Sequence, residues 1–297
     1  MFHELQIFEN PEAILLVASI IFFFSIIAGK AGFRFGLPAL LLFLGVGMLF
    51  GSDGLGIQFS NPSAAQFIGM LALSIILFSG GMDTKMSEIK PIATEGVVLA
   101  TVGVLLTTLI TGGFIYYVFL WSTGYETLTV AESMLMAAVM SSTDSASVFS
   151  ILRSKGVYLK QRLRPTLELE SGSNDPMAYM LTLLIIAYIQ VGGMNLQEAV
   201  LQLLVQLSVG AIAGFLLGKL AVLMINKINM DNESLYPILL LTTAFFTFSA
   251  TTLCKGNGYL AVYIAGLVVG NAKIVHKKSM GTFFDLSLIH ISEPTRH

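Results

Sequence analysis

Residues 168–176 read Glu168-Leu169-Glu170-Ser171-Gly172-Ser173-Asn174-Asp175-Pro176, and this polar stretch decides how the chain is expected to fold. It interrupts an apolar run at 165–191, which exceeds the roughly 20 residues that a helix needs to cross a bilayer. A charge at the bilayer centre costs at least about 2.5 kcal/mol on the mildest scale, so such side chains persist where they are paired or functional. The run therefore predicts a membrane helix that carries a functional polar cluster.

The whole chain has the composition of a membrane protein. Of its 297 residues, 55% are hydrophobic and 11% are charged, whereas a typical soluble domain is about 25% charged. We expect an all-α polytopic membrane protein with nine transmembrane helices. The nine apolar stretches lie near 12–29, 37–51, 63–82, 94–121, 131–152, 165–191, 196–225, 234–253 and 258–271.

The basic residues are distributed unequally between the two sides of this arrangement. With the N-terminus outside, Lys255 alone faces outward, and Arg296 belongs to the tail. The fourteen inner basic residues are Lys30, Arg34, Lys85, Lys90, Arg153, Lys155, Lys160, Arg162, Arg164, Lys219, Lys227, Lys273, Lys277 and Lys278. Because basic residues near span ends resist translocation, this bias predicts an outside N-terminus in a multi-pass protein of the cell inner (plasma) membrane.

Two of the apolar stretches resemble each other. Shifted by 219 residues, Gly47 and Gly51 align with Gly266 and Gly270, and the two segments run in opposite directions across the bilayer. Either two small-residue packing faces coincide, or the chain holds an inverted repeat, which is the architecture of many secondary transporters. The second interpretation predicts a first repeat at about 12–191, a linker helix at 196–225 and the start of a second repeat at 234–285.

A second polar cluster lies in the preceding apolar stretch, where Ser141-Ser142-Thr143-Asp144-Ser145 stands. At about 1.5 Å per helical residue, Asp144 lies roughly 20 Å and Asp175 roughly 15 Å from the start of its span, approached from opposite faces. Both therefore reach the middle of a core about 30 Å thick. Serines around Asp144, and Gly172 and Pro176 around Asp175, predict loosened backbone at both sites, where free oxygens suit an alkali cation.

Two short motifs give the clusters a family likeness. The pair Thr143-Asp144, together with Glu170-Ser171-x-x-Asn174-Asp175, resembles the signature motifs of the NhaP-type monovalent cation/proton antiporters. The stretches at 78–83 and 258–271 are similar to that family as well, and its potassium/proton members are the nearest likeness. The resemblance covers 12–285 and implies a C-terminally truncated, inverted-repeat sodium/proton-antiporter-like fold.

The resemblance also implies roles for individual residues. Asp175 would bind proton and cation in turn, while Thr143 and Ser171 lend oxygens to a monovalent cation, K⁺ or Na⁺. Asn174 would brace the site with Glu170 nearby. Asn174 stands where electrogenic relatives carry a second aspartate, which implies exchange of one proton for one cation. Two roles remain open for Asp144, compensation of helix dipoles and direct ion binding.

The expected function is antiport by alternating access, driven by competition of proton and cation for Asp175. A gated potassium efflux pathway or channel on the same scaffold is the alternative, and a membrane-embedded enzyme is the weaker one. We expect a homodimer in the lipid bilayer that is not an enzyme, needs no cofactor and binds no nucleic acid. The glycine ladder Gly210, Gly214 and Gly218 predicts close helix packing, with a dimer face as one candidate.

The end of the chain differs from the rest. Residues 286–297 show no membrane period and resemble a translated sequencing adapter. We expect residues 1–285 to form a partial membrane transport domain and 286–297 to be a non-native tail.

Overall fold

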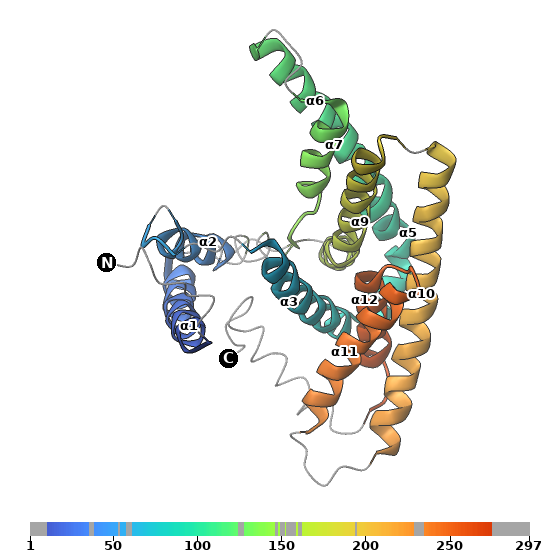
Figure 1. Ribbon diagram of the computed structural model, residues 1–297. Coiled ribbons are helices and arrows are strands. Elements are labelled where there is room, and N and C mark those ends of the chain that lie inside the picture. The colour runs from blue at the N-terminus through green and yellow to red at the C-terminus, as the bar shows by residue number, and fades with distance from the viewer. Residues whose placement is uncertain are drawn as a thin grey trace. The chain divides into compact units, whose positions relative to one another are not determined.

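In the residues that it describes, the computed structural model of the chain consists of helices joined by turns and loops (Figure 1). The described residues are 11–35, 39–52, 54–57, 61–123, 128–145, 148, 152, 159, 162–193, 195–228 and 235–274. The longer helices are α1 (Pro11–Phe35), α2 (Ala39–Phe50), α3 (Pro62–Asp83), α6 (Val104–Thr123), α7 (Val130–Val139), α9 (Leu163–Val191), α10 (Leu196–Lys227), α11 (Leu235–Leu253) and α12 (Gly258–Gly270). Short turns connect α3 to α6, namely α4 (Met86–Ile89), η1 (Lys90–Ile92), α5 (Ala93–Val98) and the π-helical turn η2 (Leu99–Gly103).

The chain divides into two compact units. The first comprises Met1–Gly69, Ser145–Tyr158 and Gly281–His297, and within it α1 packs on α2, with the rings of Phe24 and Phe50 5.6 Å apart. The second comprises Met70–Asp144 and Leu159–Met280. This second unit contains residues 141–144 and 168–176, and the packing between helices described below lies within it.

Each apolar stretch expected from the sequence contains a helix in the described part of the chain. Five helical stretches there are long and apolar enough to cross a membrane: Glu12–Lys30, Pro62–Asp83, Met86–Ser122, Gln197–Lys227 and Leu235–Leu253. The expectation of an all-α membrane protein is therefore confirmed. The helix α7 ends at Val139, well short of the expected 131–152, and most of residues 146–158 lie outside the described part.

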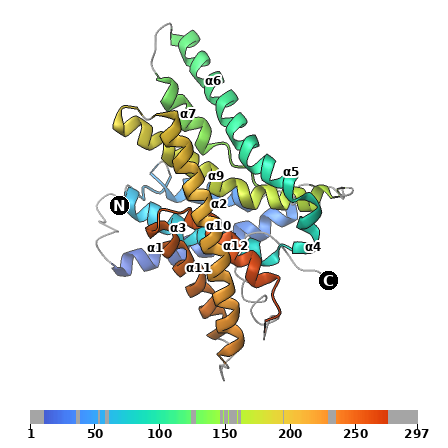
Figure 2. The ribbon, with the colours of Figure 1, turned by 90° about the vertical axis from the view of Figure 1, so that its right-hand side faces the viewer.

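The short helix α12 forms the centre of the second unit. It is apolar on all sides, and nine of its thirteen residues are buried. Such a helix is stable only when neighbours cover every face. Here α3, α9, α10 and α11 surround it, and Figure 2 shows α10 crossing alongside α11 and α12.

Glycines bring α3 and α12 into backbone contact. A Cβ added at Gly266 would overlap the carbonyl oxygen of Phe78, and one at Gly81 would lie 2.9 Å from the backbone nitrogen of Leu267. The atoms in the way belong to the backbone, so no side-chain rotation can relieve the overlap. Close approach of these two helices therefore requires small residues on both.

The glycine ladder of α10 packs inside the chain. A Cβ at Gly210 would lie 2.8 Å from the carbonyl oxygen of Asn257, and one at Gly218 would lie 3.0 Å from the Cα of Ala265. Gly214 lies against Ala261 in the same way. The predicted close packing is confirmed, but its partner is α12, so the ladder is not free to form a dimer face. Long-range partners of a small-residue face are not readable from its spacing alone.

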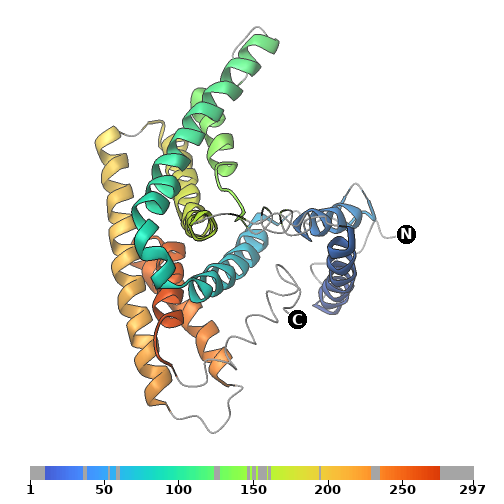
Figure 3. The same cartoon turned by 180° about the vertical axis from the view of Figure 1, so that it is seen from behind.

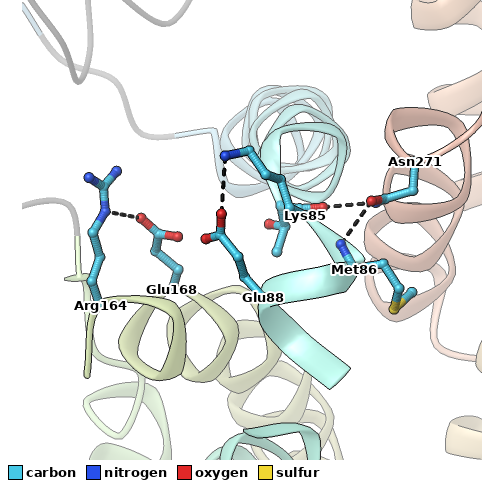
Figure 4. Close-up of polar contacts among 7 residues, drawn as sticks. Lys85, Met86, Glu88, Arg164, Glu168 and Asn271 are labelled. Atoms are coloured by element: carbon cyan, nitrogen blue, oxygen red, sulfur yellow. Dashed lines mark hydrogen bonds and ion pairs between the residues drawn. The ribbon is translucent and has the colours of Figure 1, made fainter. Parts of the chain in front are cut away.

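The end of α12 is tied to the turn that follows α3 (Figure 4). Asn271 accepts a 2.8 Å hydrogen bond from the Met86 backbone N–H and donates a 2.8 Å bond to the Thr84 carbonyl. Asn226, near the end of α10, donates to the Lys273 carbonyl at 3.0 Å. The ends of α3, α10 and α12 therefore lie together.

We expect Gly266→Ala to destabilise the protein by about 1–3 kcal/mol, because the added methyl group forces α3 away from α12. Gly80→Ala on α3 is the matched control, since a Cβ there meets nothing within 4 Å. Thermal unfolding of the purified protein in detergent measures both. Equal melting temperatures for the two variants would contradict the close packing.

Candidate functional site

The polar cluster that begins at Ser141 lies where α7 ends. A capping box begins this helix, with the Thr129 hydroxyl accepting from the Glu132 N–H at 3.2 Å and the Glu132 carboxylate accepting from the Thr129 N–H at 2.8 Å. At the other end the Ser141 hydroxyl donates to the Ala138 carbonyl at 2.7 Å, and residues 141–144 are not helical. Serine and threonine offer the backbone such local alternatives to helical bonds. The loosened backbone expected here is confirmed.

The polar cluster at 168–176 lies on α9, and here the expectation of loosened backbone was wrong. The helix continues without a break from Leu163 to Val191, through both Gly172 and Pro176. Proline at position 176 removes one helical hydrogen bond, to the carbonyl four residues earlier, and that loss is local. Pro176, Met177 and Ala178 are buried, so packing holds the helix across the missing bond.

Hydrogen bonds join the two clusters, as their similar depth in the bilayer predicts. The Ser142 hydroxyl donates to the carboxylate of Asp175 and approaches the Asn174 side-chain oxygen at 3.4 Å. The Thr143 hydroxyl donates to the Glu170 carboxylate at 2.9 Å. Ser142 is thus in contact with two residues of α9 that follow it by 32 and 33 positions in the sequence.

Thr143 is the centre of this network. Its carbonyl accepts from the Ser171 hydroxyl at 3.1 Å and from the Asn174 amide at 3.2 Å. Its hydroxyl accepts from the same amide at 2.7 Å, and that amide also reaches the Glu170 carboxylate at 2.9 Å. Asn174 is fully buried, whereas Asp175 is partly buried and Thr143 is exposed. Asn174 therefore fixes the segment 141–144 against α9.

Of the six residues predicted from the sequence, the structure brings five into this one network, namely Asp175, Asn174, Thr143, Ser171 and Glu170. The sixth, Asp144, is exposed at the end of the non-helical segment. Sequence reasoning did not single out Ser142, although its position beside Thr143 in a serine run was a signal. Glu168 lies outside the network, since it pairs with Arg164 at 2.8 Å, as Figure 4 shows.

The chemistry of this network suits a small hard cation. The network joins hydroxyl, carbonyl and carboxylate oxygens from two segments, and it includes the Asp175 carboxylate through Ser142. Among the described residues, no group of three or more His, Cys, Asp or Glu side chains is placed to hold a metal ion. The oxygens present are ligands for alkali or alkaline-earth ions and poor ones for softer metals.

The helices α6, α7 and α9 pack on one another, and Figure 3 shows α6 and α7 as the two green helices. Thr108 on α6 and Ser133 on α7 are buried side chains of this bundle. The apolar side chains Val104, Ala138, Met177 and Leu181 form a packed cluster between the three helices. This cluster holds α7 and α9 together on the side away from α12.

Comparisons with known proteins show which proteins the chain is similar to. The K(+)/H(+) antiporter NhaP of Alkalimonas amylolytica is 38% identical over 267 residues, which make up 90% of this chain and 45% of that protein. The K(+)/H(+) antiporter NhaP2 of Shewanella oneidensis is 36% identical over 266 residues, 89% of this chain and 45% of that protein. The chain therefore spans less than half the length of these relatives.

A solved structure shares the fold. The sodium proton antiporter MjNhaP1 of Methanocaldococcus jannaschii superposes with a TM-score of 0.72 at 24% identity, covering 93% of this chain and 68% of that one. The family described as "Sodium/hydrogen exchanger, transmembrane" matches residues 13–291. These matches confirm the resemblance drawn from the two motifs, and the chain belongs to the sodium/hydrogen exchanger family.

Proposed function

We propose that the whole protein exchanges a monovalent cation, K⁺ or Na⁺, for protons across the inner membrane, and that Asp175 carries both in turn. Family membership supports transport as the activity in place of catalysis. The observation that carries the assignment to Asp175 is its place in the network, where the Ser142 hydroxyl of the neighbouring segment donates to its carboxylate and Thr143 binds Glu170, Ser171 and Asn174 on the same stretch of α9. Asp175, Thr143 and Ser171 are the proposed cation ligands.

The mechanism needs only one carboxylate with two competing occupants. A cation bound at Asp175 disfavours its protonation, and a proton removes the charge that the cation needs. If the site opens alternately to each side, a proton gradient then drives the cation in the opposite direction. Asn174 supplies no second charge, which supports exchange of one proton for one cation.

The topology proposed for this function has nine spans in residues 1–285 and an outside N-terminus. The charge bias supports it, and so does the packing of the second unit. Hydrogen bonds bring together the turn after α3, the end of α10 and the end of α12, which carry Lys85, Lys227 and Lys273. Basic residues gathered at one end of a helical unit favour a cytoplasmic location for that end. The inverted repeat and the homodimer stay predictions.

Replacing Asp175 by Asn should abolish exchange. The amide keeps the size of the side chain and an oxygen for Ser142, but it can neither take up a proton nor offer a charge to the cation. Full-length protein in liposomes, with a dye that reports internal pH, measures proton movement driven by a K⁺ or Na⁺ gradient. Retained proton movement would refute the assignment, and cation flux without linked proton flux would favour the channel.

Asp144→Asn is the companion variant. If Asp144 compensates helix dipoles, its loss costs about 0.3–1 kcal/mol, which lowers the exchange rate by about 2- to 5-fold. Direct cation binding by Asp144 predicts a loss as large as that of Asp175→Asn in the same assay. The comparison therefore decides between the two roles left open for this residue.

The Asn174–Glu170 hydrogen bond can be tested by exchanging the amide and the carboxylate between the two positions. Asn174→Asp alone should lower both stability and exchange, because two carboxylates would then lie about 3 Å apart and the single hydrogen of the Thr143 hydroxyl cannot serve both. Adding Glu170→Gln returns an amide donor to the pair and should restore the melting temperature. Thermal unfolding of the wild type, the single variants and the double variant measures this. A double variant no more stable than Asn174→Asp would contradict the proposed bracing role.

A further inference from the structure

Asn257 lies outside the network around Asp175 but is bonded to the residue beside it. The Asn257 amide donates a 2.9 Å hydrogen bond to the carbonyl of Pro176, across 81 residues of sequence. Both residues are buried, with Asn257 4% exposed and Pro176 below 2%. A buried bond between an amide and a carbonyl in apolar surroundings fixes the position of both partners.

The side chain of Asn257 does more than cap a helix. Its oxygen accepts from the Leu260 N–H at 3.1 Å, which is the normal N-cap of α12. Serine, threonine or aspartate would cap this helix about as well. Capping uses only the side-chain oxygen of Asn257. It does not explain why the side chain also carries an amide N–H that donates to the Pro176 carbonyl.

The backbone of Asn257 is itself held firmly. Its N–H donates to the Gln206 carbonyl of α10 at 3.0 Å, and Gly210 allows the two backbones to approach closely. The preceding turn includes Lys255 at a φ of 61° and a 2.9 Å bond from the Gly256 N–H to the Thr251 carbonyl. The contacts with α10 and α11 therefore fix the position of Asn257. Its hydrogen bond to the Pro176 carbonyl in turn fixes α9 relative to these two helices.

Two hydrogen bonds hold one turn of α9. Ser142 binds the side chain of Asp175 from the segment 141–144, and Asn257 binds the backbone carbonyl of Pro176 from the start of α12. The turn is thus held from two directions, which limits rotation of α9 about its axis. A rotation would carry the Asp175 carboxylate away from the Ser142 hydroxyl.

We propose that Asn257 is a positioning residue for Asp175, which holds the Asp175–Pro176 turn in register with the segment 141–144 through its bond to the Pro176 carbonyl. This inference rests on the proposed function. Binding a cation requires several oxygens at once, so a misplaced carboxylate binds cations less tightly. Losing one buried hydrogen bond should therefore raise the half-saturating cation concentration by roughly 3- to 10-fold, with the maximal rate little changed.

The test uses Asn257→Ser in the full-length protein in liposomes, with proton movement measured over a range of K⁺ or Na⁺ concentrations. Serine keeps the N-cap but is too short to donate to Pro176, so α12 should stay intact. Asn61→Ser is the matched control, because Asn61 caps α3 with a 3.1 Å bond to the Ala64 N–H and is exposed. We expect the half-saturating concentration to rise for Asn257→Ser and to stay unchanged for Asn61→Ser.

Two results would overturn the inference. In one, Asn257→Ser saturates at the wild-type cation concentration while Asp175→Asn is inactive, which leaves the proposed function standing and removes the role of Asn257. In the other, Asn257→Ser only lowers the melting temperature and the amount of folded protein, with unchanged cation dependence per folded molecule. Activity of Asp175→Asn would instead refute the proposed function itself.

Discussion

The structure depends on one constraint, which is that backbone groups leaving a helix in apolar surroundings must find other partners. Residues 141–144 leave the helix, and α9 supplies the partners through Ser171 and Asn174, both of which donate to the Thr143 carbonyl. The side chains that look like ion ligands therefore also stabilise the break in the neighbouring segment. Site and fold cannot be separated here, because removing the Asn174 amide would take away one of the two donors that bind the Thr143 carbonyl.

The same constraint explains why α12 is short and covered on all sides. Its glycines and alanines let the backbones of α3 and α10 approach closely, so that a thirteen-residue helix is buried over most of its surface. Close backbone approach also leaves little room for α12 to shift relative to α10. Because α12 is fixed and packs against α9, it limits movement of the polar turn of α9. The apolar cluster around Val104 and Met177 packs α9 against α6 and α7.

Local features of the structure could be predicted from the sequence, and long-range ones could not. Composition and spacing were enough to predict the helices from the apolar runs, and the two polar motifs from the Thr143-Asp144 pair and the motif ending in Asp175. These predictions need no knowledge of which segments pack together. The continuity of α9 through Pro176 was missed, because proline weakens a helix locally and the packing that compensates comes from distant segments. The role of Asn257 has the same origin, since its partner lies 81 residues away and no periodicity links the two.

The network also suggests why hydroxyls surround the proposed ion site. Ser142 and Thr143 now donate to the carboxylates of Asp175 and Glu170, which is the arrangement suited to charged side chains without a cation. A hydroxyl can turn its hydrogen away and present a lone pair, whereas an amide N–H has a fixed direction and no lone pair to offer. On the proposed function, a cation at Asp175 would therefore recruit these two oxygens by rotation of their O–H groups alone. The buried amides of Asn174 and Asn257 would keep donating to the same carbonyls whether or not a cation is bound. On this proposal the hydroxyl side chains take part in the exchange, and the amide side chains hold the site in position.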